Sequence, residues 1–134
     1  MEAPDPPQEH PARRYGRWVL AAFFMAAGAN HFIHPAPYLA MMPSYLPAPA
    51  ALVWISGAAE VLGGMGVLYS RTRVPAGWGL MLLLVAVFPA NLNAALHGWP
   101  GHRLPAWIMW VRLPFQLLLL RWVYQVCISR HQKA

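Results

Sequence analysis

Acidic residues are scarce in this chain, and they are unevenly placed. Only four of its 134 residues are Asp or Glu, and three of those four lie within the first nine positions. The fourth, Glu60, lies inside a long apolar stretch. Charged residues make up 10% of the chain, against about 25% in an ordinary soluble domain. So few charges cannot cover a water-facing surface, which excludes a soluble enzyme, a disordered chain and a secreted mini-protein. The 58% of hydrophobic residues indicates a lipid-facing protein.

Cysteine and cofactor motifs are scarce as well. Cys127 is the only cysteine, so the chain can form no internal disulfide and no CxxC dithiol. The sequence has no Walker motif, no phosphate-binding glycine loop and no Ser/His/Asp arrangement in a supporting context. His31 and His34 are three residues apart, but Pro35 predicts a helix end there and no second cluster supports a metal site. We therefore expect no metal centre and no evident cofactor.

Four apolar stretches have the length of membrane-spanning helices. They cover residues 15–33, 50–69, 74–96 and 104–124, each near the roughly 20 residues that cross a bilayer core. No alternation of period two appears, which disfavours a β-barrel. The sequence therefore predicts an all-α fold, an integral membrane four-helix bundle in residues 13–126. A disordered tail (1–12) precedes it, and a short basic tail (127–134) follows it.

Basic residues predict the orientation of this bundle. They lie before the first stretch, between the second and third, and after the fourth, as Arg13, Arg14, Arg17, Arg71, Arg73, Arg130 and Lys133. The first-to-second connection has no Lys or Arg, and the third-to-fourth has only Arg103. The positive-inside rule then places both termini in the cytoplasm and both long connections outside. Because the arginines cluster at the ends of apolar runs, we expect the bilayer rather than nucleic acid as the partner.

Proline residues interrupt the helical pattern at three places. Five of them lie in the apolar segment 34–50, which predicts a short interfacial or re-entrant piece packed over the mouth of the bundle. Pro89 and Pro114 lie inside the third and fourth stretches, where each leaves one carbonyl without its helical donor. We expect kinks at both positions.

Polar side chains lie at depths where lipid would surround a single helix. Because such groups are costly there, they normally face the bundle interior and find partners. At 1.5 Å per residue, Glu60 lies about 15 Å and Arg112 about 12 Å below the outer surface. We expect these two to pair, with other polar residues lining the approach from outside. The complete expected site is Asn30, His31, Glu60, Asn91, Arg112 and Gln116.

Two interpretations of these polar residues remain open. In the first, they form a buried ligand-binding site, in which His31 exchanges protons or forms hydrogen bonds and Asn91 orients the ligand through its amide. In the second, they form a structural clasp that fixes the helix register and binds nothing.

Five ordered motifs resemble those of one family. They lie in the strings GANHFIHPAPYLAMMPSYLP, LVWISGAAEVLGGMGVL, SRTRVPAGWGLMLLLVAVFPANLN and RLPFQLLLLRWVY. In order they read NHF, PxxLP, SGxxExxGG, FPAN and RLPxQ, and together they resemble the DoxX-like family of small bacterial membrane proteins. The resemblance covers about residues 16–125, and its motifs fall on the six polar residues named above.

The resemblance implies a four-helix bundle in the inner membrane of a bacterium, with a redox role. Relatives named as thiosulfate:quinone oxidoreductase subunits, and others linked to oxidative-stress complexes, imply an oxidoreductase partner and make a quinone a candidate ligand. The chain has no cysteine pair, so we expect a subunit or accessory of a membrane-associated redox system rather than an enzyme on its own. The alternatives are a small-solute transporter or channel-like protein, which would need to form a homo-oligomer, and a non-catalytic scaffold.

Overall fold

The regular structure of the chain is helical. The structure, a computed structural model, describes residues 3–4, 8–98 and 105–129. Within them, the helices are α1 (Pro11–Ile33), α2 (Pro35–Met41), α3 (Pro49–Leu68), α4 (Arg73–Ala86), α5 (Phe88–His97) and α6 (Ala106–Cys127). The expected all-α class is therefore confirmed. Arg103, Arg130, Lys133 and the ends of both expected tails lie outside the described residues.

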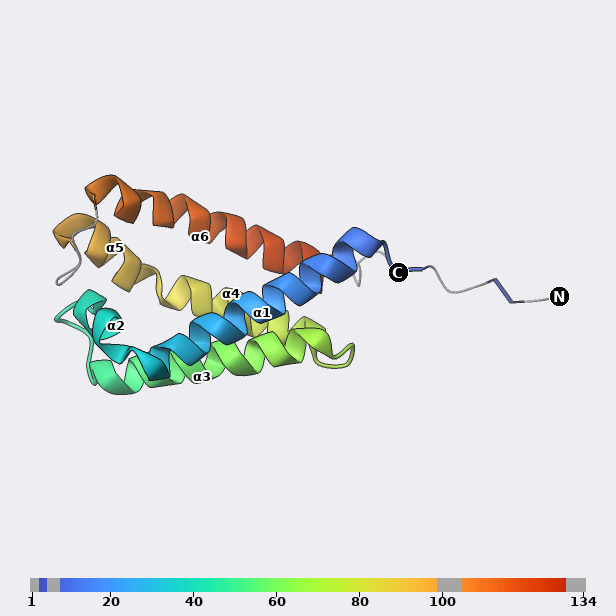
Figure 1. The fold of residues 1–134 in the computed structure, drawn as a ribbon, viewed down its shortest axis with the longest axis horizontal. Helices are drawn as coiled ribbons and strands as arrows, with labels where there is room; N and C mark the ends of the chain where they lie inside the picture. Colours follow the sequence, from blue (N-terminus) through green and yellow to red (C-terminus); the bar gives the residue numbers. More distant parts are fainter. Residues whose placement is uncertain (1–2, 5–7, 99–104, 130–134) are drawn as a thin grey trace.

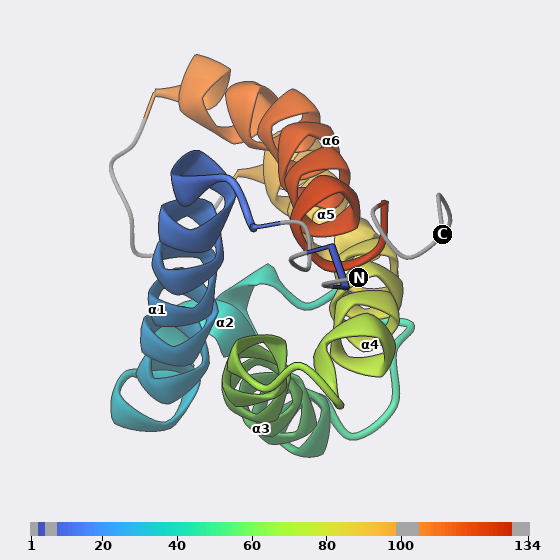
Figure 2. The ribbon, with the colours of Figure 1, turned by 90° about the vertical axis from the view of Figure 1, so that its right-hand side faces the viewer.

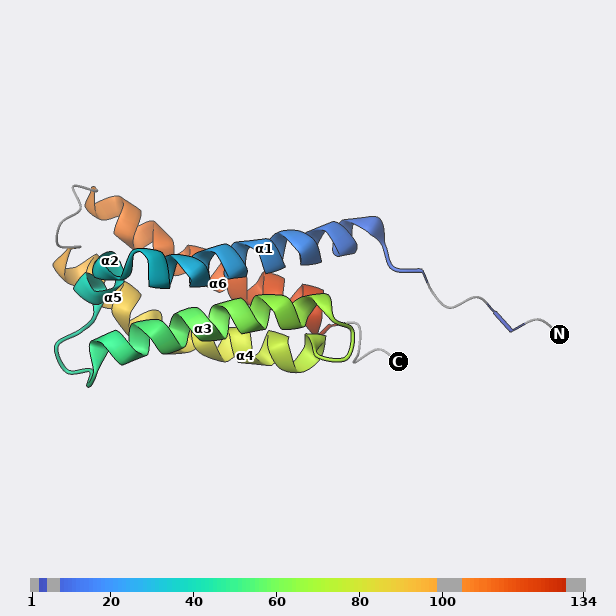
Figure 3. The ribbon, with the colours of Figure 1, turned by 60° about the horizontal axis from the view of Figure 1, so that its bottom comes forward.

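The long helices pack in a ring, which Figure 2 shows end-on. In this ring α1 packs on α3, α3 on α4, α4 on α6, and α6 on α1. The first turns of α1, the last turns of α6 and the connection between α3 and α4 lie at one end of the molecule (Figure 1). The short helices α2 and α5 lie together at the opposite end (Figures 1 and 3).

Two helical stretches among the described residues are long and apolar enough to cross a membrane. They are Pro49–Leu68, which is α3, and Arg73–His97, which combines α4 and α5. A third span results if α1 and α2, which meet at 91°, count as one bent element. The remaining expected span is α6, which has 22 residues but is less apolar because Arg112, Gln116 and Arg121 interrupt it.

The expected proline breaks take different forms. Segment 34–50 does contain a short helix, α2, which begins at Pro35 and turns away from α1 at His34. The third stretch is interrupted at Val87, so that Pro89 lies in the first turn of α5, where a missing N–H costs nothing. Pro114 instead lies inside α6, which continues past it.

Arginine side chains close the helix ends at the end where α1 begins. Nη2 of Arg13 donates to the Val126 carbonyl at 3.1 Å, and Nε of Arg73 donates to the Val67 carbonyl at 2.9 Å. Both carbonyls belong to last turns, which lack helical partners and carry the negative end of the helix dipole. Arg17 forms an ion pair with Glu9 at the same end. The helix α1 begins at Pro11, which is earlier than residue 15, where the first apolar stretch was expected to begin.

Glycines bring α1 and α3 into backbone contact. A Cβ on Gly28 would lie 2.5 Å from the carbonyl oxygen of Gly57, and one on Gly57 would lie 2.9 Å from the carbonyl oxygen of Gly28. Only glycine allows two backbones to approach this closely. The crossing fixes how α1 and α3 are rotated about their own axes and therefore which of their side chains meet.

Candidate functional site

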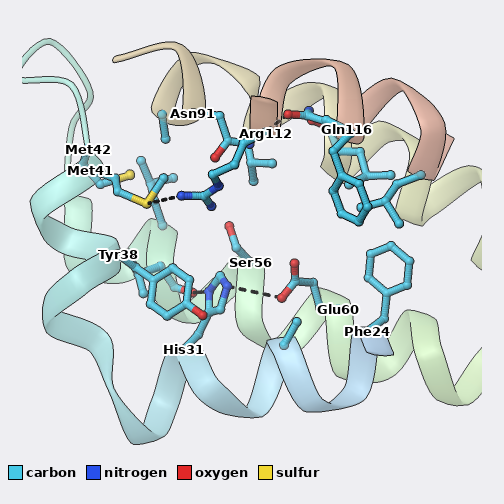
Figure 4. Close-up of a pocket in the computed structure, with 18 of the residues that line it drawn as sticks. Phe24, His31, Tyr38, Met41, Met42, Ser56, Glu60, Asn91, Arg112 and Gln116 are labelled. Carbon is cyan, nitrogen blue, oxygen red and sulfur yellow. Dashed lines mark hydrogen bonds and ion pairs between the residues drawn. The ribbon is translucent and has the colours of Figure 1, made fainter. Parts of the chain in front are cut away.

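A cavity of about 250 Å³ opens between the helices at the end occupied by α2 and α5. Its walls come from α1, α2, α3 and α6 and from the region where α4 gives way to α5 (Figure 4). The polar side chains that line it are His31, Tyr38, Ser56, Glu60, Asn91, Arg112 and Gln116. Polar groups from elements far apart in the sequence therefore converge on one space.

Glu60 and His31 form an ion-pair contact on one wall of this cavity. Oε2 of Glu60 lies 3.2 Å from Nε2 of His31, and both side chains are largely buried. The contact does not have the geometry of a hydrogen bond, so among the described residues Oε2 is a buried oxygen without a donor. Figure 4 shows the other oxygen of Glu60 pointing into the space between α3 and α6.

The other ring nitrogen of His31, Nδ1, and one face of its ring also have contacts. Nδ1 lies 3.0 Å from the carbonyl oxygen of Val53, and since a carbonyl only accepts, Nδ1 carries the proton of this hydrogen bond. The Tyr38 ring of α2 stacks on the imidazole with centroids 3.9 Å apart. Tyr38 is held in turn by Asn30, whose Nδ2 donates to its hydroxyl oxygen at 2.7 Å. The imidazole is therefore fixed with Nε2 facing Glu60.

Asn91 and Gln116 form a second polar cluster across the cavity. Nδ2 of Asn91 donates to Oε1 of Gln116 at 2.8 Å, and Nε2 of Gln116 donates to the Leu84 carbonyl. That carbonyl lies in the last turn of α4, where helical donors run out before the interruption at Val87. Gln116 therefore joins α4, α5 and α6 through its single amide.

Arg112 enters the cavity from α6, on the wall opposite to His31 and Glu60 (Figure 4). Its Nη1 lies 4.0 Å from Sδ of Met41, on α2. The ion-pair partner of Glu60 is therefore His31 rather than Arg112, and Arg112 adds a cation to the opposite wall of the same cavity. Matching depth along α3 and α6 brought both residues to one cavity, but it did not decide which neighbour each side chain meets.

The rest of the cavity is apolar and aromatic. Phe23, Phe24 and Phe115 line it together with Leu119, and Figure 4 shows Phe24 beyond Glu60, on the side away from α2. The Phe23 and Phe24 rings pack edge to face with centroids 5.4 Å apart. The cavity thus has a polar part and an apolar part, a division typical of sites that orient small molecules.

Five of the six expected site residues line the cavity, and the sixth acts behind it. Asn30 is not a lining residue, and it holds the Tyr38 hydroxyl instead. The expected site did not include Tyr38, Met41 or Ser56. A piece packed over the mouth was expected in segment 34–50, but its prolines did not show which of its side chains would face the cavity. The signal for Tyr38 was its apolar, aromatic character in a segment already expected to cover the mouth.

The described residues contain no group of three or more His, Cys, Asp or Glu side chains that could hold a metal ion. The side chains that line the cavity supply one carboxyl group, one imidazole, one guanidinium, two amides and two hydroxyls around aromatic rings.

Comparison with known proteins places the chain in a family. Residues 20–127 match the family described as "Domain of unknown function (DUF8561)", and the chain belongs to it. The match runs from the middle of α1 to the last residue of α6, and it includes every residue that lines the cavity. No curated protein and no solved structure matches the chain.

Proposed function

We propose that this chain is a bacterial inner-membrane four-helix protein whose cavity binds a small amphipathic molecule. The observation that carries the proposal is the cavity itself, in which polar groups of α1, α2, α3, α5 and α6 converge beside phenylalanine rings. Such groups are costly within a membrane and are retained there chiefly for pairing or for function.

The outer surface of the helices supports the membrane part of this proposal. Large apolar side chains are exposed along it on every long helix, which suits lipid and not water. Examples are Phe32, Trp54, Ile55, Leu62, Leu82, Val85, Leu117 and Leu118. On this surface, α6 acts as the fourth span, and its Arg112 and Gln116 face the cavity rather than the lipid.

The arginines support one orientation. Arg13, Arg17 and Arg73 lie at the end where α1 begins, and the cavity lies toward the other end. By the positive-inside rule, the arginine-rich end faces the cytoplasm. The cavity then opens in the outer half of the membrane, beneath α2.

The resemblance to DoxX-like proteins supports a redox context. In this context the chain is a subunit or accessory of a membrane oxidoreductase, and its ligand is a quinone-type molecule with a polar ring and an apolar tail. Polar groups would hold the ring oxygens, and the phenylalanine side would meet the apolar part of the molecule. The chain itself supplies recognition rather than electron transfer.

Purification in a mild detergent, followed by mass spectrometry of bound small molecules and proteins, tests this proposal. The matched control is Ala27→Phe, because Ala27 lines the cavity without contributing a polar group, and a phenyl ring there would fill the space. We expect an amphipathic molecule to purify with the natural chain and to be lost from Ala27→Phe, and an oxidoreductase to purify with the natural chain. Identical ligand-free and partner-free preparations would overturn the proposal.

A structural clasp is the second candidate, and the Asn91–Gln116 contact favours it. That contact and the Gln116 bond to Leu84 already hold three helices together without any ligand. If the clasp is the whole function, Ala27→Phe should leave the biological activity of the chain intact, since it disturbs neither hydrogen bond. Loss of activity in Ala27→Phe with an unchanged fold would decide for the cavity.

A further inference from the structure

We infer that the ligand of this cavity is a single-ring aromatic alcohol, of the phenol or hydroquinone class, whose hydroxyl donates a hydrogen bond to Glu60. This inference rests on the proposed function, since it names the chemical class that the same cavity takes. Among quinone-type molecules it selects the reduced hydroquinone, which carries hydroxyl donors, over the quinone, which carries only acceptors.

The first step concerns the proton between His31 and Glu60. The Val53 carbonyl holds the proton on Nδ1, so Nε2 faces the carboxyl group at 3.2 Å. Two groups that only accept would repel at that distance, and the pair must therefore hold one more proton. It lies either on the imidazole or on the carboxyl group.

The second step follows for either position of that proton. An ionised Glu60 is an acceptor at both oxygens, and a Glu60 protonated toward His31 still has a carbonyl oxygen. Figure 4 shows that the oxygen not facing His31 points into the space between α3 and α6. The cavity therefore presents an acceptor in both cases, and the complementary ligand group is a donor. The oxygen of an ether or of a quinone is also only an acceptor, so at this place it would repel the oxygen of Glu60.

The third step concerns the body of the ligand. A volume of about 250 Å³ lies just below the roughly 300 to 1,000 Å³ of pockets for drug-sized molecules, so one ring with short substituents fits best. The Phe23, Phe24 and Phe115 side chains offer ring edges and faces to such a molecule. Aromatic contacts of this kind add affinity without asking for further polar groups on the ligand.

Arg112 defines the rival class, which is an aromatic carboxylate. A guanidinium favours carboxylate groups, and it lines the same cavity. Glu60 opposes that class, because an anion in a space of this size would also approach a carboxyl oxygen. The two classes differ in which of the two residues dominates recognition, and matched probes distinguish them.

Equilibrium dialysis of the full chain in detergent, with three probes of similar size, tests the inference. The probes are 4-propylphenol, its methyl ether 4-propylanisole, and 4-propylbenzoate. Ala27→Phe, with its cavity filled, measures the binding of each probe to the micelle alone. We expect the natural chain to bind the phenol about 10-fold or more tightly than the ether, the effect of one hydrogen bond to a charged or strongly polar group.

Variants assign that preference to Glu60. Glu60→Leu removes the acceptor and should reduce the phenol-to-ether ratio to near one. Gln125→Leu, the same kind of change at an exposed position of α6, should leave the ratio unchanged. The comparison of probes on the natural chain needs no variant, so it stands even if Glu60→Leu does not fold.

Three results would overturn the inference. Equal binding of phenol and ether would show a cavity that holds rings without using Glu60, and the proposed function would survive. Tighter binding of the benzoate would assign recognition to Arg112, and the proposed function would again survive. Binding of no probe above the level of Ala27→Phe would overturn the inference and the ligand-binding function together.

Discussion

His31 and Glu60 meet because each packs against a glycine of the other helix where α1 and α3 cross. Gly28 precedes His31 on α1, Gly57 precedes Glu60 on α3, and the two glycine backbones are in direct contact. The two helices run in opposite directions (Figure 1), and each polar residue packs against the glycine of the other helix: a Cβ on Gly57 would lie 2.7 Å from the Cβ of His31, and one on Gly28 would lie 2.9 Å from the Cβ of Glu60. The 3.2 Å contact between Nε2 and Oε2 is therefore a consequence of helix packing.

The first prediction tests this crossing. Gly28→Ala should destabilise the chain by about 1 to 3 kcal/mol, because its methyl group would meet the Gly57 carbonyl oxygen and force the helices apart. The midpoint of thermal unfolding in detergent measures the effect. The control is Gly79→Ala on α4, where an added Cβ meets nothing within 4 Å and where alanine is the better helix former. Equal behaviour of the two variants would refute the close crossing.

The second prediction concerns the pairing of His31 with Glu60. In a double-mutant cycle of His31→Leu, Glu60→Leu and the double variant, the two changes should be non-additive by at least about 0.5 kcal/mol. Each single change leaves one buried polar partner behind, while the double change removes both. Arg112→Leu in place of His31→Leu provides the comparison, and its coupling to Glu60 should be smaller. A stronger coupling to Arg112 would contradict the assigned partner.

The third prediction concerns the amide that joins three helices. Gln116→Leu should cost about 1 to 3 kcal/mol, because it leaves the Asn91 amide and the Leu84 carbonyl without their partner in a buried place. Thermal unfolding provides the measurement. Gln125→Leu makes the same exchange at an exposed position of α6 and should change the midpoint little. Similar losses in both variants would indicate a general effect of leucine on α6.

The fourth prediction is a pH dependence at the arginine-rich end. The hydrogen bond from Arg17 lowers the pKa of Glu9 below its usual range. A carboxyl group with a lowered pKa in the folded state stabilises the fold above its unfolded pKa and loses this effect as the pH falls. The pair should therefore add up to about 1 kcal/mol at neutral pH and progressively less below about pH 4.3.

Glu9→Gln tests that dependence. The variant should unfold at a lower temperature than the natural chain at pH 7, and the difference should shrink at pH 3. A difference that stays constant between these two pH values would show that the charge of Glu9 is not the cause.

The sequence predicted the helices well and the neighbours of each side chain poorly. Apolar length and proline positions located the interruption near Pro89 and the helix of residues 49–68 to within one or two residues. Because polar groups are costly in lipid, the sequence selected six residues as a site, and five of them line one cavity. These predictions needed only distance along each helix, which the sequence provides at 1.5 Å per residue.

The rotation of each helix about its axis was the missing information. Glu60 and Arg112 lie at similar depth, but α3 packs on α1 and α4, so the partner of Glu60 comes from α1. Gly28 and Gly57 held a signal, since glycines at a helix interface allow the close approach that brings α1 and α3 into backbone contact. The structure shows Gly63 against the side chain of Leu80 on α4.

Methyl NMR of the chain labelled at methionine tests the central claim most directly, because methionines lie both at the cavity and away from it. Met41 and Met42 line the cavity, and Met65 is exposed on the outer face of α3. On titration with 4-propylphenol, the account predicts saturable shifts of the Met41 and Met42 methyl signals, an unchanged Met65 signal, and no saturable shift in Ala27→Phe. Shifts of all three signals alike, or none at Met41 and Met42, would contradict a ligand site in this cavity.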